Sequence, residues 1–155
     1  MPEALALGFD CSAAHCAAAL LSGDRVLAVR GEAMAKGQAE RLMPMLEELL
    51  GEGGATWRDL AVIGVGTGPG SFTGTRIAVA AARGLALGLG IPAVGVGLAE
   101  VAGRAGASEP EEIAIAVARA ALRRRDAPGP RPAPLYARPA DAAPARDRGP
   151  AIIPG

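Results

Sequence analysis

The sequence predicts an α/β fold in which a mixed β-sheet carries helices on its flanks. Three observations lead to this prediction. Short apolar runs separated by turn residues open the chain, apolar residues repeat at helical spacing over 38–50 and 71–89, and further apolar runs occupy 60–66 and 91–97. The chain has 155 residues, of which 50% are apolar and 3% aromatic, so its core must be aliphatic.

Three strands are expected first. Residues 5–12 form a buried strand that ends in a polar turn, and residues 16–32 form a hairpin around the turn at 22–24. Residues 38–50 then form a helix, which Gly51, Gly53 and Gly54 end. A core strand, a glycine-rich turn, a second helix and another strand follow. This order is the pattern of one lobe of the actin-like and sugar-kinase-like ATPases, a ribonuclease H-like arrangement.

The last third of the chain is expected to be simpler. Residues 98–105 carry a short helical stripe, and a capping box at 108–111 with Pro110 in the first turn starts a helix that ends near Arg125. The remainder is rich in Pro and Ala, which predicts an extended tail pinned by Leu135 and Tyr136. The chain is therefore divided into a lobe at 1–97, a shortened region with the closing helix at 98–126, and a tail at 127–155.

The glycine-rich turn GTGPGS resembles a phosphate cradle but matches neither common motif. The spacing of its glycines fails the dinucleotide pattern, and no lysine follows as a P-loop requires. Two interpretations stay open. Backbone N–H groups at the helix start could bind an anion, with Asp10, Ser12, Gly68 and Gly70 as the nucleotide-binding residues. Alternatively, the glycines only permit a tight turn beside close-packed helices.

The helix at 71–89 is apolar on nearly every side, so it needs cover on two sides. Ala80, Gly84 and Gly88 recur every four residues and form a strip for close backbone approach. The neighbouring helix at 38–50 would complete a partner interface, although a purely internal core is the alternative. The predicted interface consists of Leu42, Met45, Leu46, Leu49, Leu50, Ile77, Ala80, Ala81, Gly84, Leu85 and Gly88.

Residues suited to catalysis are few. His15 is the only histidine and is expected to be an ordinary hairpin residue, and no His, Cys or carboxylate cluster has the spacing of a metal site. Ser12 and Ser71 lack an evident base, which argues against a serine hydrolase. Asp10 could be the base of a phosphotransfer reaction, so a nucleotide-binding phosphotransferase or ATPase acting at Asp10 and the turn at 66–70 is the alternative function.

Charge and cysteine content bear on location and partners. Two cysteines and an N-terminus without a basic leader indicate the cytoplasm, and no run is apolar enough to predict a membrane span. The net charge is zero, but basic residues gather after residue 118. The arginines at 123–125 either contact nucleic acid or are solvated at a helix end.

Three segments together resemble the bacterial TsaB (YeaZ) family: FDCSAAHCAAAL, GQAERLMPML and GTGPGSFTGTRIAVAAARGLALGLGIPAVGV. The resemblance implies a degenerate member of the actin-like ATPase superfamily. Such a protein is a non-catalytic scaffold that pairs with a TsaD-like catalytic subunit and a TsaE-like ATPase. Together these subunits install threonylcarbamoyl on N6 of adenosine 37 in tRNAs that read ANN codons.

The same resemblance implies that the chain forms a homodimer when alone, contacts tRNA only indirectly and has no cofactor of its own. ATP and a metal ion belong to the partner subunits. The catalytic relatives bind their metal through paired histidines on the first helix, whereas residues 37–45 here contain none. One departure is large: the family's second α/β lobe is mostly absent between the strand at 91–97 and the closing helix.

Overall fold

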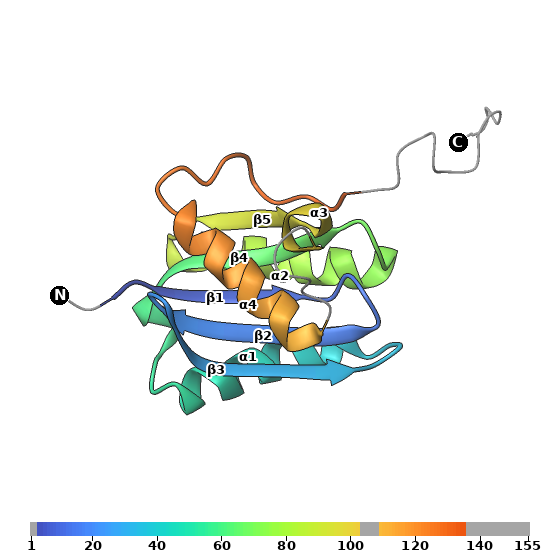
Figure 1. Ribbon diagram of the computed structural model, residues 1–155, viewed down its shortest axis with the longest axis horizontal. Helices are drawn as coiled ribbons and strands as arrows, with labels where there is room; N and C mark the ends of the chain where they lie inside the picture. The colour runs from blue at the N-terminus through green and yellow to red at the C-terminus, as the bar shows by residue number, and fades with distance from the viewer. Residues whose placement is uncertain (1–2, 103–108, 136–155) are drawn as a thin grey trace.

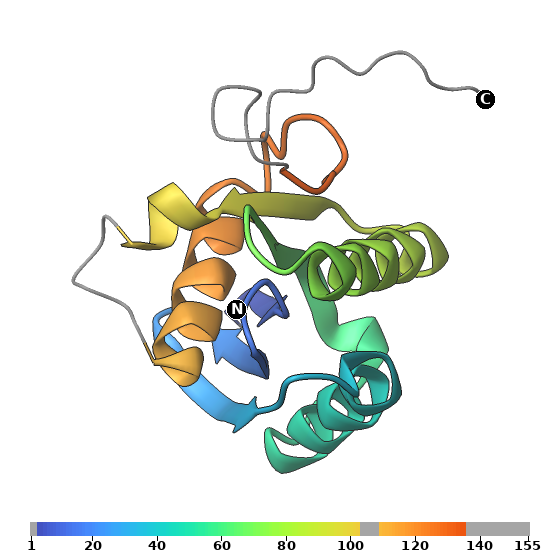
Figure 2. The ribbon, with the colours of Figure 1, turned by 90° about the vertical axis from the view of Figure 1, so that its right-hand side faces the viewer.

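The protein is described by a computed structural model that covers residues 3–102 and 109–135. Three layers build it. A five-stranded sheet forms the middle layer, helices α1 (Gln38–Glu52) and α2 (Phe72–Leu89) cover one face, and helix α4 (Pro110–Arg123) crosses the other (Figure 1 and Figure 2). The predicted mixed sheet with flanking helices is confirmed.

The sheet combines antiparallel and parallel pairing in the order β3-β2-β1-β4-β5. Its first three strands are antiparallel neighbours, whereas β1, β4 and β5 run parallel to one another. The strands are β1 (Leu5–Asp10), β2 (His15–Ser22), β3 (Arg25–Ala33), β4 (Leu60–Gly68) and β5 (Ala93–Gly97). Because β1 and β4 are parallel, their carboxyl ends meet at one edge, where the glycine-rich turn begins.

Two smaller elements complete the described chain, and helix α4 starts differently from the prediction. A 3-10 helix, η1 (Trp57–Asp59), was not predicted, and α3 (Leu98–Ala102) follows β5 directly. The N-cap of α4 is Glu109, whose capping box is completed by Glu112, so the box predicted at 108–111 is wrong by one residue. Proline at the first helical position fixes this start, because it makes the preceding residue the cap.

Each face of the sheet carries its own aliphatic core. On one face, Phe9, Leu20, Ile63 and their neighbours pack against the leucines of α1 and the alanines of α2. On the other face, small residues of α4 lie against small residues of the strands. Helix α4 therefore closes the sheet within the same layered unit as β1–β5, rather than standing apart from it.

The C-terminal segment is tied to the sheet where the structure describes it. The Leu135 N–H donates to the carbonyl oxygen of Thr67 at 2.8 Å, and Pro132 is buried beside Gly95. The predicted pinning by Leu135 is thus made by its backbone, while its side chain is 49% exposed. Tyr136, the other predicted anchor, lies outside the described residues. Within those residues, no helix combines the length and apolar character needed to cross a membrane.

Candidate functional site

Helix α2 presents one side to the sheet and the opposite side to solvent. The Ser71 side chain caps its start by accepting a hydrogen bond from Gly74 N at 3.1 Å, and Gly90 ends it in the left-handed conformation. Ala78 and Ala82 are buried against the sheet. Apart from the first turn, the exposed residues of α2 are Arg76, Ala80, Arg83, Gly84, Leu87 and Gly88, so only two of these six side chains carry a charge.

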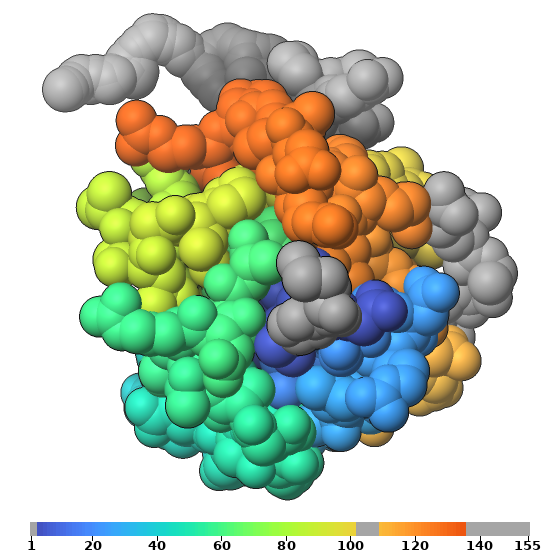
Figure 3. Space-filling view, turned by 90° about the vertical axis from the view of Figure 1, so that its left-hand side faces the viewer, coloured from blue at the N-terminus to red at the C-terminus, as the bar shows by residue number. Residues whose placement is uncertain are grey.

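Two hollows flank this outward side. One, of about 470 Å³, lies between α2 and the α1–β4 connection and is lined by Gly84, Gly88, Met43 and Trp57 among others. The other, of about 640 Å³, lies between the end of α2 and residues 128–132. Figure 3 shows the end of α2 in yellow-green beside the green connection. Leu87, which is 86% exposed, lines the second hollow and is an unusually exposed apolar side chain.

The glycines of this side meet nothing in the chain itself. A Cβ atom added at Gly84 or Gly88 would have no atom within 4 Å. Glycine in the middle of a helix costs roughly 0.5–1 kcal/mol relative to alanine. No neighbour among the described residues requires glycine here. We therefore define the open face of α2 as Ala80, Gly84, Leu87 and Gly88.

The structure corrects part of the predicted interface. Five of its residues lie on α1 and are at most 4% exposed, because they form the core under the sheet: Leu42, Met45, Leu46, Leu49 and Leu50. These five cannot contact a partner directly. Three more, Ile77, Ala81 and Leu85, are half-buried against that core. Only Ala80, Gly84 and Gly88 are exposed as the prediction requires. The helical spacing in the sequence could not distinguish the buried residues of the predicted interface from the exposed ones.

Three charged side chains on the outer surface of α1, Arg41, Glu48 and Glu52, are already paired. Arg41 donates to both carboxylate oxygens of Glu32 on β3, at 2.8 and 2.7 Å, and also to Glu48. Arg30 binds Glu48 and Glu52. Hydrogen bonds from Arg41 hold the pKa of Glu32 and that of Glu48 below the usual range for glutamate. This ion-pair network fastens α1 to β3 and leaves α2 as the open apolar element.

The glycine-rich turn packs tightly against the loop between β1 and β2. Ser71 N donates to the carbonyl oxygen of Ser12 at 2.7 Å. A Cβ atom at Gly70 would lie 2.0 Å from that oxygen, and one at Gly74 would lie 2.1 Å from the carbonyl oxygen of Cys11. Gly68 has a positive φ of 80°. Close backbone approach therefore explains why these positions are glycine.

Asp10 and Ser12, two of the predicted nucleotide-binding residues, meet in a buried polar cluster together with His15. The Ser12 hydroxyl donates to Asp10 at 2.8 Å, Ser12 N donates to Asp10 Oδ2 at 3.1 Å, and His15 Nε2 lies 2.7 Å from the same oxygen. All three residues are less than 9% exposed. A Cβ atom at Gly66 would lie 1.8 Å from Asp10 Oδ1, so the cluster also fills the space beside β4.

His15 is a hairpin residue as predicted, since it is the first residue of β2, but its pairing with Asp10 was not predicted. The hairpin register brings its ring back to the end of β1, and the spacing of Asp, Ser and His around one turn was the signal that could have found it. Which of these three side chains are hydrogen-bonded to one another determines what the cluster can do chemically. Ser12 and His15 both bond to the carboxylate and no bond joins them, so the cluster is not the relay that activates a serine nucleophile.

Among the residues at 3–102 and 109–135, no group of three His, Cys, Asp or Glu side chains could hold a metal ion. Of the other predicted nucleotide-binding residues, Gly70 borders a hollow of about 300 Å³ that Pro134 and Leu135 help to enclose, and a Cβ atom at Gly68 would lie 3.4 Å from Thr75 Oγ1. Thr75 lies in the same wall, and its buried hydroxyl has no hydrogen-bond partner in the described structure.

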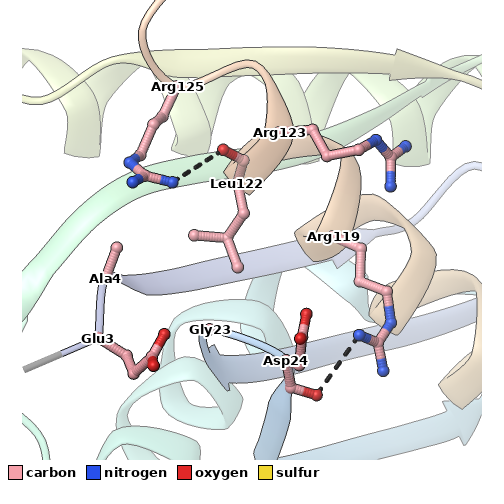
Figure 4. Close-up of a pocket in the computed structure, with 8 residues that line it drawn as sticks. All are labelled: Glu3, Ala4, Gly23, Asp24, Arg119, Leu122, Arg123 and Arg125. Atoms are coloured by element: carbon pink, nitrogen blue, oxygen red, sulfur yellow. Dashed lines mark hydrogen bonds between the residues drawn. The ribbon is translucent and has the colours of Figure 1, made fainter.

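The arginines near the end of α4 largely bond to the protein itself. Arg125 donates to the carbonyl oxygen of Leu122 at 3.1 Å, and Arg119 donates to that of Asp24 at 3.4 Å (Figure 4). Arg124 donates to the carbonyl oxygen of Gly95 at 2.6 Å. Cationic side chains at a helix C-terminus also interact favourably with its dipole. These contacts favour the helix-end interpretation over a dedicated nucleic-acid surface.

Comparisons with known proteins agree with this geometry. The family described as TsaD, tRNA N6-adenosine threonylcarbamoyltransferase, matches residues 29–122. YeaZ from Pseudomonas aeruginosa is 39% identical with a TM-score of 0.62, over 66% of this chain and 48% of that chain. A second structure, titled an uncharacterized protein with similarity to peptidase YEAZ from Pseudomonas aeruginosa, is also 39% identical, with a TM-score of 0.61 over 66% and 47% of the two chains.

A more distant likeness concerns the fold alone. RuvC from T. thermophilus, solved in complex with Holliday junction substrate, is 15% identical with a TM-score of 0.55, over 83% of this chain and 99% of that chain. The structural likeness thus extends over nearly the whole of that RuvC chain. None of the curated proteins matches. The chain spans about half the length of the YeaZ structures that it matches. The extent of the family match and the likeness to YeaZ show that the chain belongs to the TsaD family and is TsaB/YeaZ-like within it.

Proposed function

We propose that this chain is a non-catalytic scaffold subunit in the synthesis of threonylcarbamoyladenosine at position 37 of ANN-decoding tRNAs. In this proposal it works in the cytoplasm and binds a TsaD-like catalytic subunit. A TsaE-like ATPase completes the assembly, and the ATP and the metal ion belong to these partners. The tRNA is held mainly by the catalytic subunit, so this chain contacts it indirectly.

The open face of α2 is the observation that carries the proposal. Two glycines face empty space at a cost to helix stability, and the exposed Leu87 lines one of the two hollows beside them. A partner helix could approach the backbone closely at Gly84 and Gly88 and receive Leu87 in a pocket of its own. When no partner is present, two copies of the chain would cover this face by forming a homodimer.

The non-catalytic part of the proposal draws on the polar cluster. The Asp10 carboxylate already accepts hydrogen bonds from the Ser12 hydroxyl and backbone, and it lies 2.7 Å from His15 Nε2. A general base must reach the proton that it abstracts, and this carboxylate is only 3% exposed. The cluster is therefore better suited to holding the β1–β2 loop than to phosphotransfer.

The decisive experiment compares two glycine-to-arginine variants. Gly84→Arg places a charge and bulk in the open face, whereas Gly51→Arg places the same side chain on exposed α1, where a Cβ atom also meets nothing within 4 Å. Sedimentation of each variant, alone and with a TsaD-like subunit, reports self-association and partner binding. A buried unpaired charge costs several kcal/mol, roughly 3–5 by analogy with broken buried pairs, so Gly84→Arg should bind at least about a hundredfold more weakly.

Equal binding by both variants would contradict the proposed interface. Titration of the unmodified chain with an ATP analogue tests the alternative function at the same time. Saturable binding that is lost when Gly70 is replaced would favour a nucleotide-handling protein. Reconstituted tRNA modification that depends on the chain, without any bound nucleotide on it, supports the scaffold.

A further inference from the structure

The two cysteines occupy opposite positions at the end of the β1–β2 hairpin. The register of the β1–β2 hairpin pairs Leu5 with Ser22 and ends by pairing Asp10 with Ala17. One step further along both strands places Cys11 opposite Cys16. Residues directly opposite in antiparallel strands have Cα atoms about 4.5–5.5 Å apart. This spacing lies inside the range of about 4.4–6.8 Å that a disulfide spans.

The side chains point toward each other as well. The Sγ atoms of Cys11 and Cys16 are 3.9 Å apart, and both thiols are free and buried. Cys16 Sγ also lies 3.9 Å from Met45 Sδ on α1. A disulfide bond is about 2.05 Å long, so χ1 rotations at two facing cysteines must bring the sulfur atoms closer by about the length of a bond. No large backbone movement is required.

The two thiols differ in their chemistry. The Cys11 thiol donates its hydrogen bond to Cys16 Sγ, which lowers the pKa of Cys16. Donating that bond, together with burial, raises the pKa of Cys11. Since the thiolate is the reactive form, the hydrogen bond that Cys16 Sγ accepts from Cys11 favours Cys16 as the nucleophile and Cys11 as the thiol that resolves the first product.

We propose that Cys11 and Cys16 are a redox-active pair that closes to an intramolecular disulfide when the protein meets a peroxide. The Cys16 thiolate attacks one peroxide oxygen, the O–O bond breaks, and hydroxide leaves, which gives a sulfenic acid on Cys16. The Cys11 sulfur then attacks the Cys16 sulfur. The S–S bond forms as the S–O bond breaks, and the hydroxyl leaves as water with the Cys11 proton. Two thiols are oxidised and one hydrogen peroxide becomes two waters.

Access to the pair is through the hairpin loop. Ala13 and Ala14, in the loop that joins the two cysteines, are exposed, whereas both thiols are buried. Hydrogen peroxide is scarcely larger than water, so a brief opening of the loop admits it. A larger oxidant would need a larger opening, which predicts that peroxide acts faster than a bulky disulfide reagent.

The disulfide would act on the junction of helices α1 and α2. The carbonyl of Cys11 touches Gly74 at the start of α2, the carbonyl of Ser12 accepts from Ser71, and Cys16 contacts Met45 of α1. Closing the bridge draws Cys16 toward Cys11 and away from Met45. Oxidation therefore fixes the loop on which α2 is seated, whatever partner α2 binds.

Mass spectrometry of the reduced full chain after treatment with hydrogen peroxide tests the pair directly. The expected product is a monomer that has lost two hydrogen atoms, has no titratable thiol in denaturant, and regains both thiols with dithiothreitol. Addition of oxygen atoms without loss of the two hydrogens, thiols that stay unreacted in the folded protein, or disulfide-linked dimers would overturn the proposal.

Single variants identify the role of each sulfur. Cys11→Ala should stop at the sulfenic acid, which dimedone traps on Cys16. Cys16→Ala should react more slowly than the parent by about tenfold or more, because the remaining thiol has the higher pKa. Dimedone labelling on Cys11 at the parental rate would contradict the assignment. The unmodified protein reports bridge formation even if either variant folds poorly.

Discussion

Helices α4 and α2 are both built from small residues, yet these residues serve opposite purposes. Alanines of α4 lie so close to the sheet that the facing strand positions must be glycine: a Cβ atom at Gly8 would be 2.6 Å from Ala118 N, and one at Gly64 would be 2.8 Å from Ala121 Cβ. On α2, Gly84 and Gly88 face open space. Glycine next to α4 is explained within the chain, whereas glycine on the open face of α2 is not.

The enclosed glycines beside α4 matter for the stability of the fold, whereas the open glycines of α2 matter for association with a partner. Where a glycine is enclosed by the chain's own backbone, a larger side chain must push two layers apart. Where no atom of the chain lies near a glycine, a larger side chain changes the free energy of unfolding little. It affects only the binding of a partner that approaches this face. Matched glycine-to-alanine changes on the two helices can therefore test the contrast with one methyl group each.

The largest effect is expected at the closed interface. Gly8→Ala puts a methyl group against the backbone of α4 at Ala118. Since neither backbone can rotate away, we expect a loss of about 3 kcal/mol in the free energy of unfolding, at the upper end of the usual cost of overpacking. Urea denaturation followed by circular dichroism measures it. A loss below the uncertainty of the fit would mean that α4 is not held at this distance.

Asp10→Asn should have the next largest effect. The amide nitrogen cannot accept the hydrogen bonds that the carboxylate receives from Ser12, so one buried donor loses its partner. We expect a loss of roughly 1–3 kcal/mol in unfolding free energy. Binding to a TsaD-like subunit should stay within a few-fold of the parent.

Asp24→Asn at an exposed turn is the control for this change. In reconstituted tRNA modification, removal of a true general base typically lowers the rate by about 10²–10⁴. A loss of that size in the Asp10→Asn variant, with folding intact, would move Asp10 from a structural to a catalytic role.

Sequence reasoning found the fold because local patterns and pairing rules act on the same residues. The apolar runs, the turn at Gly23 and the capped helices fix which segments are strands and helices. The five strands and helices α1, α2 and α4 begin and end within about two residues of prediction, whereas the end of the stripe predicted at 98–105 lies outside the described residues. The candidate site was harder to predict from the sequence. Leu42 and Gly84 both lie on apolar helical stripes, and only the tertiary structure shows that one is enclosed while the other is open.

His15 illustrates the same limit for polar groups. Its burial beside Asp10 depends on the hairpin register and on the space left by Gly66, neither of which a single residue encodes. The start of α4 after its N-cap Glu109 and the presence of η1 likewise depend on the conformation of the neighbouring backbone. Burial and pairing are properties of contacts between distant segments, so they had to come from the structure.

A smaller effect, of opposite sign, is expected on the open face of α2. Gly84→Ala or Gly88→Ala removes a flexible residue from the middle of a helix and meets no neighbour. Each change should raise the unfolding free energy of the monomer by roughly 0.5–1 kcal/mol. If a partner helix approaches here, the same changes should weaken binding. A gain in stability with unchanged partner binding would place the interface elsewhere.

The smallest effect concerns the paired charges that distinguish α1 from α2. Arg41→Gln removes the hydrogen bonds that lower the pKa of Glu32 and that of Glu48. A carboxylate with a lowered pKa in the folded state adds stability above its unfolded pKa, near 4.5, and this stability is lost as the pH falls through the folded value. The melting temperature of the parent should therefore exceed that of the variant at about pH 7, and the gap should close below about pH 4. Added salt should narrow the gap in melting temperature too, since exposed pairs are screened.

Partner binding should not change in the Arg41→Gln variant, because the network fastens α1 to β3 and leaves the open face of α2 untouched. Weaker partner binding by Arg41→Gln at neutral pH would show that the charged surface of α1 belongs to the interface after all.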